Sequence, residues 1–122
     1  MIEKKAVQFS KIIVSGDGIP EISPEETLKN AQFCKVIDVR RPDEFNAELG
    51  HIEGAKLVTL GPDLLTEISA LNPSESIIFV CRSGGRSGQA TLAALQKGLK
   101  HAVNMSGGML SWNEKGLPVS RS

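Results

Sequence analysis

Two arginines and two glycines follow one cysteine within five residues, and this combination favours reactive sulfur chemistry. The run is Cys81-Arg82-Ser83-Gly84-Gly85-Arg86-Ser87. Its small residues allow consecutive backbone N–H groups to curl inward and form an anion-binding nest. The two guanidinium groups and the N-terminus of a following helix would add positive potential at the same place. We therefore expect residues 82–87 to form a cradle around the Cys81 sulfur.

Such a cradle predicts that Cys81 is largely ionised at neutral pH. Helix N-termini and adjacent cations lower a cysteine pKa from about 8.5 to about 3.5–7.5. A thiolate is a competent nucleophile, and the cradle would also stabilise an anionic group attached to its sulfur. Two other interpretations stay open. One is an inert buried thiol at a strand end. The other is an anion-binding loop without covalent chemistry, although the Walker pattern Gly-x4-Gly-Lys-Ser/Thr is absent.

Regular elements are expected on both sides of this loop. Ile77–Val80 is continuously apolar and predicts a buried strand, and Ser87–Lys97 predicts a helix with Leu and Ala on one face. Further strands are expected at 36–39, 55–58 and 102–105, and helices beginning at Pro24, Pro42 and Pro62. Strands that alternate with helices predict an α/β fold, with a central parallel sheet of about five strands covered by helices on both faces.

Finer signals lie in the helices and at the chain ends. The helix from Pro62 should bury one apolar stripe formed by Leu64, Leu65, Ile68 and Leu71. Residues 107–116 predict a turn or short helix that places Trp112 in the core. Residues 1–18 could be an N-terminal arm or an additional strand, and the domain is expected to span residues 19–119.

Other ionisable residues are expected to support the site structurally. Asp38 and Arg40 stand at the end of a buried strand, where charges need partners. They predict an ion-pair network that includes Arg41 or Glu44. His51, in a Gly-His-Ile turn, is expected to be a hydrogen-bonded structural residue, with general-base catalysis as the alternative. Cys34 is expected to fill space.

Composition narrows the classes of partner. Of 122 residues, 14 are basic and 14 acidic, so no net field attracts nucleic acid or anionic lipid. No segment approaches the length of a membrane span, and no Cys/His cluster has zinc-ligand spacing. We expect a cytoplasmic monomer with no metal, no nucleic acid and no membrane partner.

Taken in order, several segments make the chain resemble a single-domain rhodanese, the thiosulfate sulfurtransferase family. Each segment is weak alone, but their order and spacing are specific, and together they cover residues 19–119. The segments are Val36-Ile37-Asp38-Val39-Arg40, Pro42-Asp43-Glu44-Phe45, Gly50-His51-Ile52-Glu53-Gly54-Ala55, Ile78-Phe79-Val80-Cys81-Arg82-Ser83-Gly84-Gly85-Arg86-Ser87, Gly107-Gly108-Met109-Leu110-Ser111-Trp112 and Gly116-Leu117-Pro118-Val119.

The resemblance implies a rhodanese fold and a ping-pong reaction without cofactor. Cys81 would take the outer sulfur of thiosulfate or another sulfane donor, become a persulfide, and pass that sulfur to an acceptor. The acceptor is cyanide in the usual assay and a thiol or protein in the cell. The resemblance also implies that Arg86 closes the loop and orients its carbonyls, while Arg82 points outward to meet an anionic donor.

Loop length separates the chemistries that this family resemblance leaves open. Sulfurtransferases place four residues between the cysteine and the closing arginine, whereas related phosphatases and arsenate reductases place five. Four residues separate Cys81 from Arg86 here, which favours sulfur transfer. A non-enzymatic module that carries or senses a persulfide is the main alternative, and a Cys-based phosphatase or arsenate reductase is the second.

Overall fold

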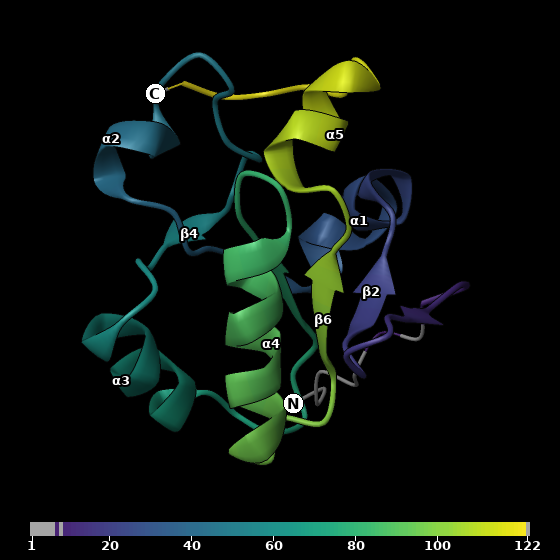
Figure 1. The fold of residues 1–122 in the computed structure, drawn as a ribbon, viewed down its shortest axis with the longest axis vertical. Helices are drawn as coiled ribbons and strands as arrows, with labels where there is room; N and C mark the ends of the chain where they lie inside the picture. Colours follow the sequence, from purple (N-terminus) through teal and green to yellow (C-terminus); the bar gives the residue numbers. More distant parts are fainter. Residues whose placement is uncertain (1–6, 8, 122) are drawn as a thin grey trace, which may run out of the picture.

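One mostly parallel sheet forms the centre of the molecule. The structure, a computed structural model, describes residues 7 and 9–121. Its strands follow the order β1-β2-β6-β5-β3-β4. Figure 1 shows β2 and β6 side by side in this sheet. The parallel strands are β2 (Pro20–Ile22), β3 (Lys35–Asp38), β4 (Lys56–Leu57), β5 (Ile77–Val80) and β6 (Ala102–Met105). A short β1 (Ile13–Val14) pairs antiparallel with β2. The predicted α/β fold is confirmed, with one antiparallel strand added.

The helices are α1 (Pro24–Asn30), the 3-10 helix η1 (Ala31–Phe33), α2 (Pro42–Phe45), α3 (Pro62–Ala70), α4 (Gly85–Gln96) and α5 (Gly108–Glu114). Three of them, α1, α2 and α3, begin at the prolines that predicted them. Ser23 caps α1, since its Oγ accepts the Glu26 N–H at 3.0 Å. Among the described residues, no helix has both the length and the apolar character needed to cross a bilayer.

Alternating side chains of the central strands point to opposite faces of the sheet and pack into two separate hydrophobic cores. On one face, Ile77 and Phe79 of β5 pack into a cluster that contains residues of α3 and α4. On the other, Ile78 and Val80 pack into a cluster that contains Trp112 of α5. Both faces are therefore covered by helices, as predicted, and a strand buried on both faces must be apolar throughout.

Two details of the predicted elements are wrong. In α3, Leu64 and Ile68 are buried, but Leu65 is 51% exposed and does not belong to the apolar stripe. Leu65 directly follows Leu64, and neighbouring helical residues point about 100° apart. Helix α4 begins at Gly85 rather than at Ser87, because Gly84 caps the helix and its carbonyl accepts the Gly88 N–H at 3.0 Å.

Candidate active site

Cys81 lies at the carboxyl end of β5, in the loop that leads into α4. Figure 1 shows this loop at the top of α4, beside the start of α5. Cys81 is only 1% exposed and packs into the core cluster shared with α4. The chain reverses at Gly84, whose φ of 105° is left-handed and favours glycine. Ligand sites in parallel sheets commonly form at this edge.

The loop that follows Cys81 places two hydrogen-bond donors against its sulfur. The Gly84 N–H donates to Sγ at 3.1 Å, and the Ser87 Oγ lies 3.3 Å from Sγ. Both donors are neutral, and both come from the run that the sequence singled out. The structure thus brings Cys81, Gly84 and Ser87 together as a cradle.

Burial and hydrogen bonding act in opposite directions on Cys81. Burial raises the pKa of Cys81, but hydrogen bonds from the Ser87 hydroxyl and from the backbone N–H groups of Ser87, Gly84 and Ser83 lower it, and the net pKa shift is downward. The sequence predicted the downward direction and attributed it jointly to the backbone nest, the helix N-terminus and the two arginines. In the structure, the largest causes that lower this pKa are hydrogen bonds from neutral donors.

Arg86 faces helix α2 and forms a bidentate ion pair there. Its Nη1 and Nη2 lie 2.7 and 2.9 Å from the two carboxylate oxygens of Glu44. This pairing lowers the pKa of Glu44 from its ordinary value of 4.5 to about 2. The prediction differs in two respects. The Glu44 carboxylate pairs chiefly with Arg86, and only the Glu44 carbonyl contacts Arg40 of the Asp38 pair, at 3.3 Å. Arg86 binds this carboxylate rather than orienting loop carbonyls. The bond to Glu44, and after it the charge of Cys81, raises the pKa of Arg86.

A small cavity of about 100 Å³ lies beside the loop. Exposed Arg82 forms part of its wall, together with Arg40, Glu44, Ala47, Glu48 and Leu49. A cavity of this size accommodates a small molecule only. Arg82 is the lining cation that is open to solvent, whereas Arg40 is buried. The exposed Ser83 and Gly85 complete the outer side of the loop.

The start of α5 holds the active-site loop in place. The N–H of Met109 donates to the Cys81 carbonyl at 2.8 Å, and the N–H of Leu110 donates to the Arg82 carbonyl at 2.9 Å. Gly108 allows this approach, since a Cβ there would lie 2.5 Å from backbone atoms of Cys81 and Arg82. The sequence gave Gly108 no role at the site, although its Gly-Gly pair was a visible signal.

Asp38 and Arg40 form a buried ion pair at the end of the neighbouring strand β3. Arg40 donates from Nε at 2.9 Å and from Nη2 at 2.8 Å to the Asp38 carboxylate, and both side chains are 1% exposed. Nη2 also donates to the Gly50 carbonyl at 2.7 Å. The pair links the strand to the segment after α2.

His51 is held close to this ion pair by stacking and by one hydrogen bond. Its ring stacks on Phe45 at a centroid distance of 3.7 Å, and its Nδ1 donates to the Phe45 carbonyl at 3.0 Å. His51 therefore makes the contacts of a structural residue. Half-buried Cys34 packs against the Trp112 core cluster, on the far side of the sheet from the cluster that contains Cys81.

Besides Gly108, two residues at the site were missed by sequence reasoning. Asn104 of β6 is 1% exposed, and its Oδ1 lies 2.5 Å from the Ser87 Oγ. Its Nδ2 donates to Glu21 of β2 at 2.8 Å and to the Gly84 carbonyl at 3.1 Å. An amide inside an otherwise apolar strand was the available signal for Asn104. Nothing in the local sequence points to Glu21.

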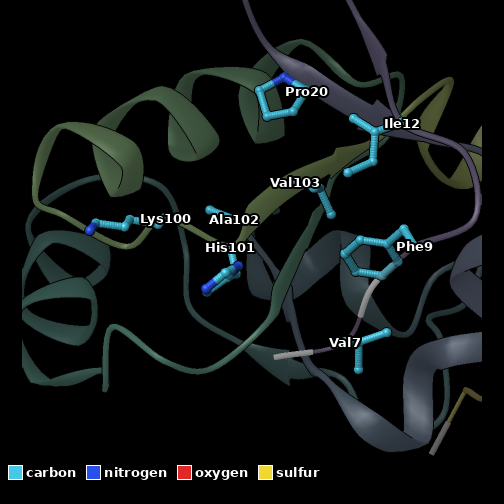
Figure 2. A pocket seen from close by; sticks show the side chains of 8 residues that line it. All are labelled: Val7, Phe9, Ile12, Pro20, Lys100, His101, Ala102 and Val103. Carbon is cyan, nitrogen blue, oxygen red and sulfur yellow. The ribbon is translucent and has the colours of Figure 1, made fainter. Parts of the chain in front are cut away.

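A larger cavity lies at the opposite edge of the sheet. Figure 2 shows its lining, which includes Phe9, Pro20, His101 and Val103, and its volume is about 380 Å³. It contains none of the loop residues. Within residues 7 and 9–121, no group of three or more His, Cys, Asp or Glu could hold a metal ion. The chemistry of nucleophile and donors therefore singles out the Cys81 loop.

The chain belongs to the rhodanese family. A family model described as "Rhodanese-like domain" matches residues 23–115. The chain is 32% identical over 113 residues to thiosulfate sulfurtransferase 18 of Arabidopsis thaliana, covering 82% of this chain and 81% of the relative. It is 30% identical to a sulfurtransferase of Allochromatium vinosum over 98 residues, covering 80% and 88%. It also matches the structure of human single-domain sulfurtransferase TSTD1, with a TM-score of 0.64 at 27% identity, over 80% and 98% of the two chains. At the level of the family, the protein is a sulfurtransferase-type transferase.

Proposed function

We propose that the protein moves a sulfane sulfur from thiosulfate or a persulfide donor to a thiol acceptor through a persulfide on Cys81. The observation that carries this proposal is the Cys81 sulfur at the end of β5, with neutral donors from Gly84 and Ser87 around it. These donors favour the thiolate without binding it to a cation. The names of the relatives support the same reaction class.

Two displacements make up the proposed cycle. The Cys81 thiolate attacks the outer sulfur of thiosulfate, a Cys81–sulfur bond forms, and the sulfur–sulfur bond of thiosulfate breaks with sulfite leaving with the electron pair. An acceptor thiolate, or cyanide in vitro, then attacks the outer sulfur of the persulfide. Cys81 leaves as a thiolate and is ready for the next donor. No cofactor takes part, and the donor and acceptor thiols imply a reducing compartment such as the cytoplasm.

The dimensions of the site support a small donor. Cys81 is 1% exposed, so only the tip of a small donor can reach its sulfur. The adjoining cavity of about 100 Å³ offers the exposed cation Arg82 to an anion. This arrangement suits the transfer of one sulfur atom better than the transfer of a complete phosphoryl group.

Intact-mass measurement tests the proposal. Incubation with thiosulfate should add the mass of one sulfur atom, and cyanide should remove it. The variant Cys81→Ser should gain nothing, whereas Cys34→Ser is the matched control and should gain sulfur like the unaltered chain. Failure to gain sulfur from thiosulfate and from every persulfide donor would overturn the proposal. A gain only from a protein persulfide would indicate a carrier module, and turnover of a phosphate ester would indicate a phosphatase.

A further inference from the structure

The Ser87 hydroxyl lies between two acceptors and carries one proton. Its Oγ is 2.5 Å from the Asn104 Oδ1 and 3.3 Å from the Cys81 Sγ. All three residues are 1% exposed or less. A hydroxyl donates one hydrogen bond, so Ser87 cannot serve both neighbours as a donor at the same time.

The orientation of the Asn104 amide is fixed by its other neighbours. Its Nδ2 lies 2.8 Å from a Glu21 carboxylate oxygen and 3.1 Å from the Gly84 carbonyl oxygen. Both are acceptors, so the two hydrogens of Nδ2 must face them. Turning the amide over would place Oδ1 against two acceptors. Oδ1 therefore faces Ser87, and the proton in the 2.5 Å contact comes from the Ser87 hydroxyl.

Ionisation of Cys81 changes which neighbour Ser87 serves. While Cys81 is a thiol, its S–H can donate to the Ser87 Oγ, and Ser87 can donate to Asn104. When the sulfur is a thiolate it only accepts, so the Ser87 proton can stabilise it only by leaving the Asn104 Oδ1. A buried acceptor that loses its donor is destabilised. Asn104 thus opposes the ionisation that Ser87 favours.

We propose that Asn104, oriented by Glu21, is a positioning residue that withholds the Ser87 proton from the Cys81 sulfur while that sulfur is neutral and yields it when the sulfur becomes charged. In the persulfide the charge lies on the outer sulfur, so Ser87 can return to Asn104. Asn104 therefore favours the loaded state over the free thiolate. This last consequence rests on the proposed sulfur transfer, whereas the competition for the proton does not.

Other charged groups around Cys81 must be separated from this effect. Arg86 of α4 interacts with the Cys81 charge and also with Asp38 of β3. Glu21 of β2 reaches the site through Asn104, and Arg82 is the exposed charge of the loop itself. Replacing Glu21 removes a negative charge as well as a hydrogen-bond acceptor. Two variants distinguish the two contributions. Glu21→Gln removes the charge but keeps an acceptor oxygen, whereas Glu21→Ala removes both the charge and the acceptor.

The first experiment measures iodoacetamide alkylation of Cys81 against pH, in a Cys34→Ser background and without any sulfur donor. Asn104→Ala should lower the Cys81 pKa by about one unit, which is roughly a tenfold gain in alkylation rate well below both pKa values. In a Ser87→Ala background the same substitution should have no effect, since Asn104 acts through Ser87. An unchanged or raised pKa, or an equal shift without Ser87, would overturn the proposal.

The Glu21 variants keep the test decisive if Asn104→Ala fails to fold. Glu21 lines a cavity of about 620 Å³ at the edge of the sheet, so its replacement disturbs little packing. Glu21→Ala should lower the Cys81 pKa by less than Asn104→Ala, and Glu21→Gln should leave it nearly unchanged. Equal shifts in both Glu21 variants would mean that charge rather than amide orientation is responsible, and the proposal would fail.

The second experiment follows the persulfide. Asn104→Ala should shorten the lifetime of the Cys81 persulfide against a fixed thiol concentration by several fold, with Ser87→Ala again removing the difference. Absence of any persulfide would overturn the proposed function and leave the alkylation result intact. An unchanged alkylation profile in a protein that does form the persulfide would overturn the role of Asn104 alone.

Discussion

The neighbouring strands β3 and β5 each lead to an ionisable group: Asp38 is the last residue of β3, and Cys81 directly follows Val80 of β5. The surroundings of the two groups are opposite in kind. At the end of β3, the negative charge of the Asp38 carboxylate is neutralised by the Arg40 guanidinium, whose Nη2 lies 2.8 Å from Oδ2, and both side chains are buried. At the end of β5, the Cys81 sulfur meets the Gly84 N–H and the Ser87 hydroxyl. The strands pair directly, from Lys35 opposite Ile77 to Asp38 opposite Val80, so the two sites share one edge of the sheet.

This difference separates a structural charge from a reactive one. A buried charge bound to its counter-ion contributes to the fold, but its lone pairs already accept hydrogen bonds from that counter-ion. A sulfur held by neutral donors is stabilised as an anion and still presents a lone pair to an electrophile. The β3 site therefore suits a fixed support, and the β5 site suits a nucleophile.

The largest expected effect comes from breaking the β3 pair. Arg40→Ala leaves the Asp38 carboxylate buried without its partner and removes the bond to the Gly50 carbonyl. We expect a loss of about 3–5 kcal/mol in the free energy of unfolding, measured by urea denaturation. Arg41→Ala is the matched control, because Arg41 is exposed and forms surface pairs. It should change the free energy of unfolding by less than about 1 kcal/mol. Equal losses in the two variants would remove the distinction between the sites.

Sequence reasoning predicted the local contacts of the two sites but not the long-range ones. The donors to Cys81 lie within six residues of it, so residue types and spacing were enough to predict the cradle. The ion pair of Asp38 was also predictable, because a charge at the end of a buried strand needs a partner, and Arg40 lies only two residues away. Local sequence could not show that Glu21 and Asn104 meet, since they are 83 residues apart and lie on adjacent strands.

The orientation of Arg86 illustrates a second limit. Its position in the loop suggested contact with loop carbonyls, but Glu44 lies 42 residues earlier and offers a carboxylate in bidentate geometry. Charge-assisted bidentate pairs are stronger than bonds to neutral carbonyls, so the long-range partner is preferred. Sequence reasoning identified both Arg86 and Glu44, but it assigned Arg86 to the Cys81 loop and Glu44 to the ion-pair network of Asp38.

The next effect concerns the support of the Cys81 loop by α5. Gly108→Ala should force the α5 start away from the Cys81 and Arg82 carbonyls, because its Cβ would lie 2.5 Å from them. We expect a loss of about 2–4 kcal/mol in the free energy of unfolding, from strain and lost contacts. Gly116→Ala is the matched control, since Gly116 has a similar left-handed φ of 68° with no neighbour within 4 Å. It should lose only about 1 kcal/mol.

Glu44 allows a pH test of the ion pair that links α2 to α4. Arg86 holds the pKa of Glu44 at about 2, below its ordinary 4.5, so the folded state prefers the ionised carboxylate. The pair's contribution is complete above about pH 5 and disappears as pH falls from 4.5 toward 2. Partial exposure of Arg86 reduces the contribution to about 1–2 kcal/mol. Urea unfolding should therefore show Glu44→Gln less stable at pH 7 and equal to the unaltered chain near pH 2. A constant difference at both pH values would contradict this role.

The smallest expected effect tests whether charge or neutral donors hold the Cys81 thiolate. Arg86→Ala removes a cation that interacts with Cys81, so the Cys81 pKa should rise and persulfide formation should slow. The Glu44 carboxylate, 2.7 Å from the Arg86 guanidinium, already neutralises much of its positive charge, and Arg86 is partly exposed. We therefore expect the Cys81 pKa to rise by only about half a unit. Ser87→Ala should raise the pKa further, because the bond from the Ser87 hydroxyl is the largest contributor that lowers it. Arg86→Lys should restore most of the original value by restoring the charge. The measurement is the pH profile of Cys81 alkylation. A larger rise in Arg86→Ala than in Ser87→Ala would show that both strand ends depend on paired charge, and the contrast between β3 and β5 would then fail.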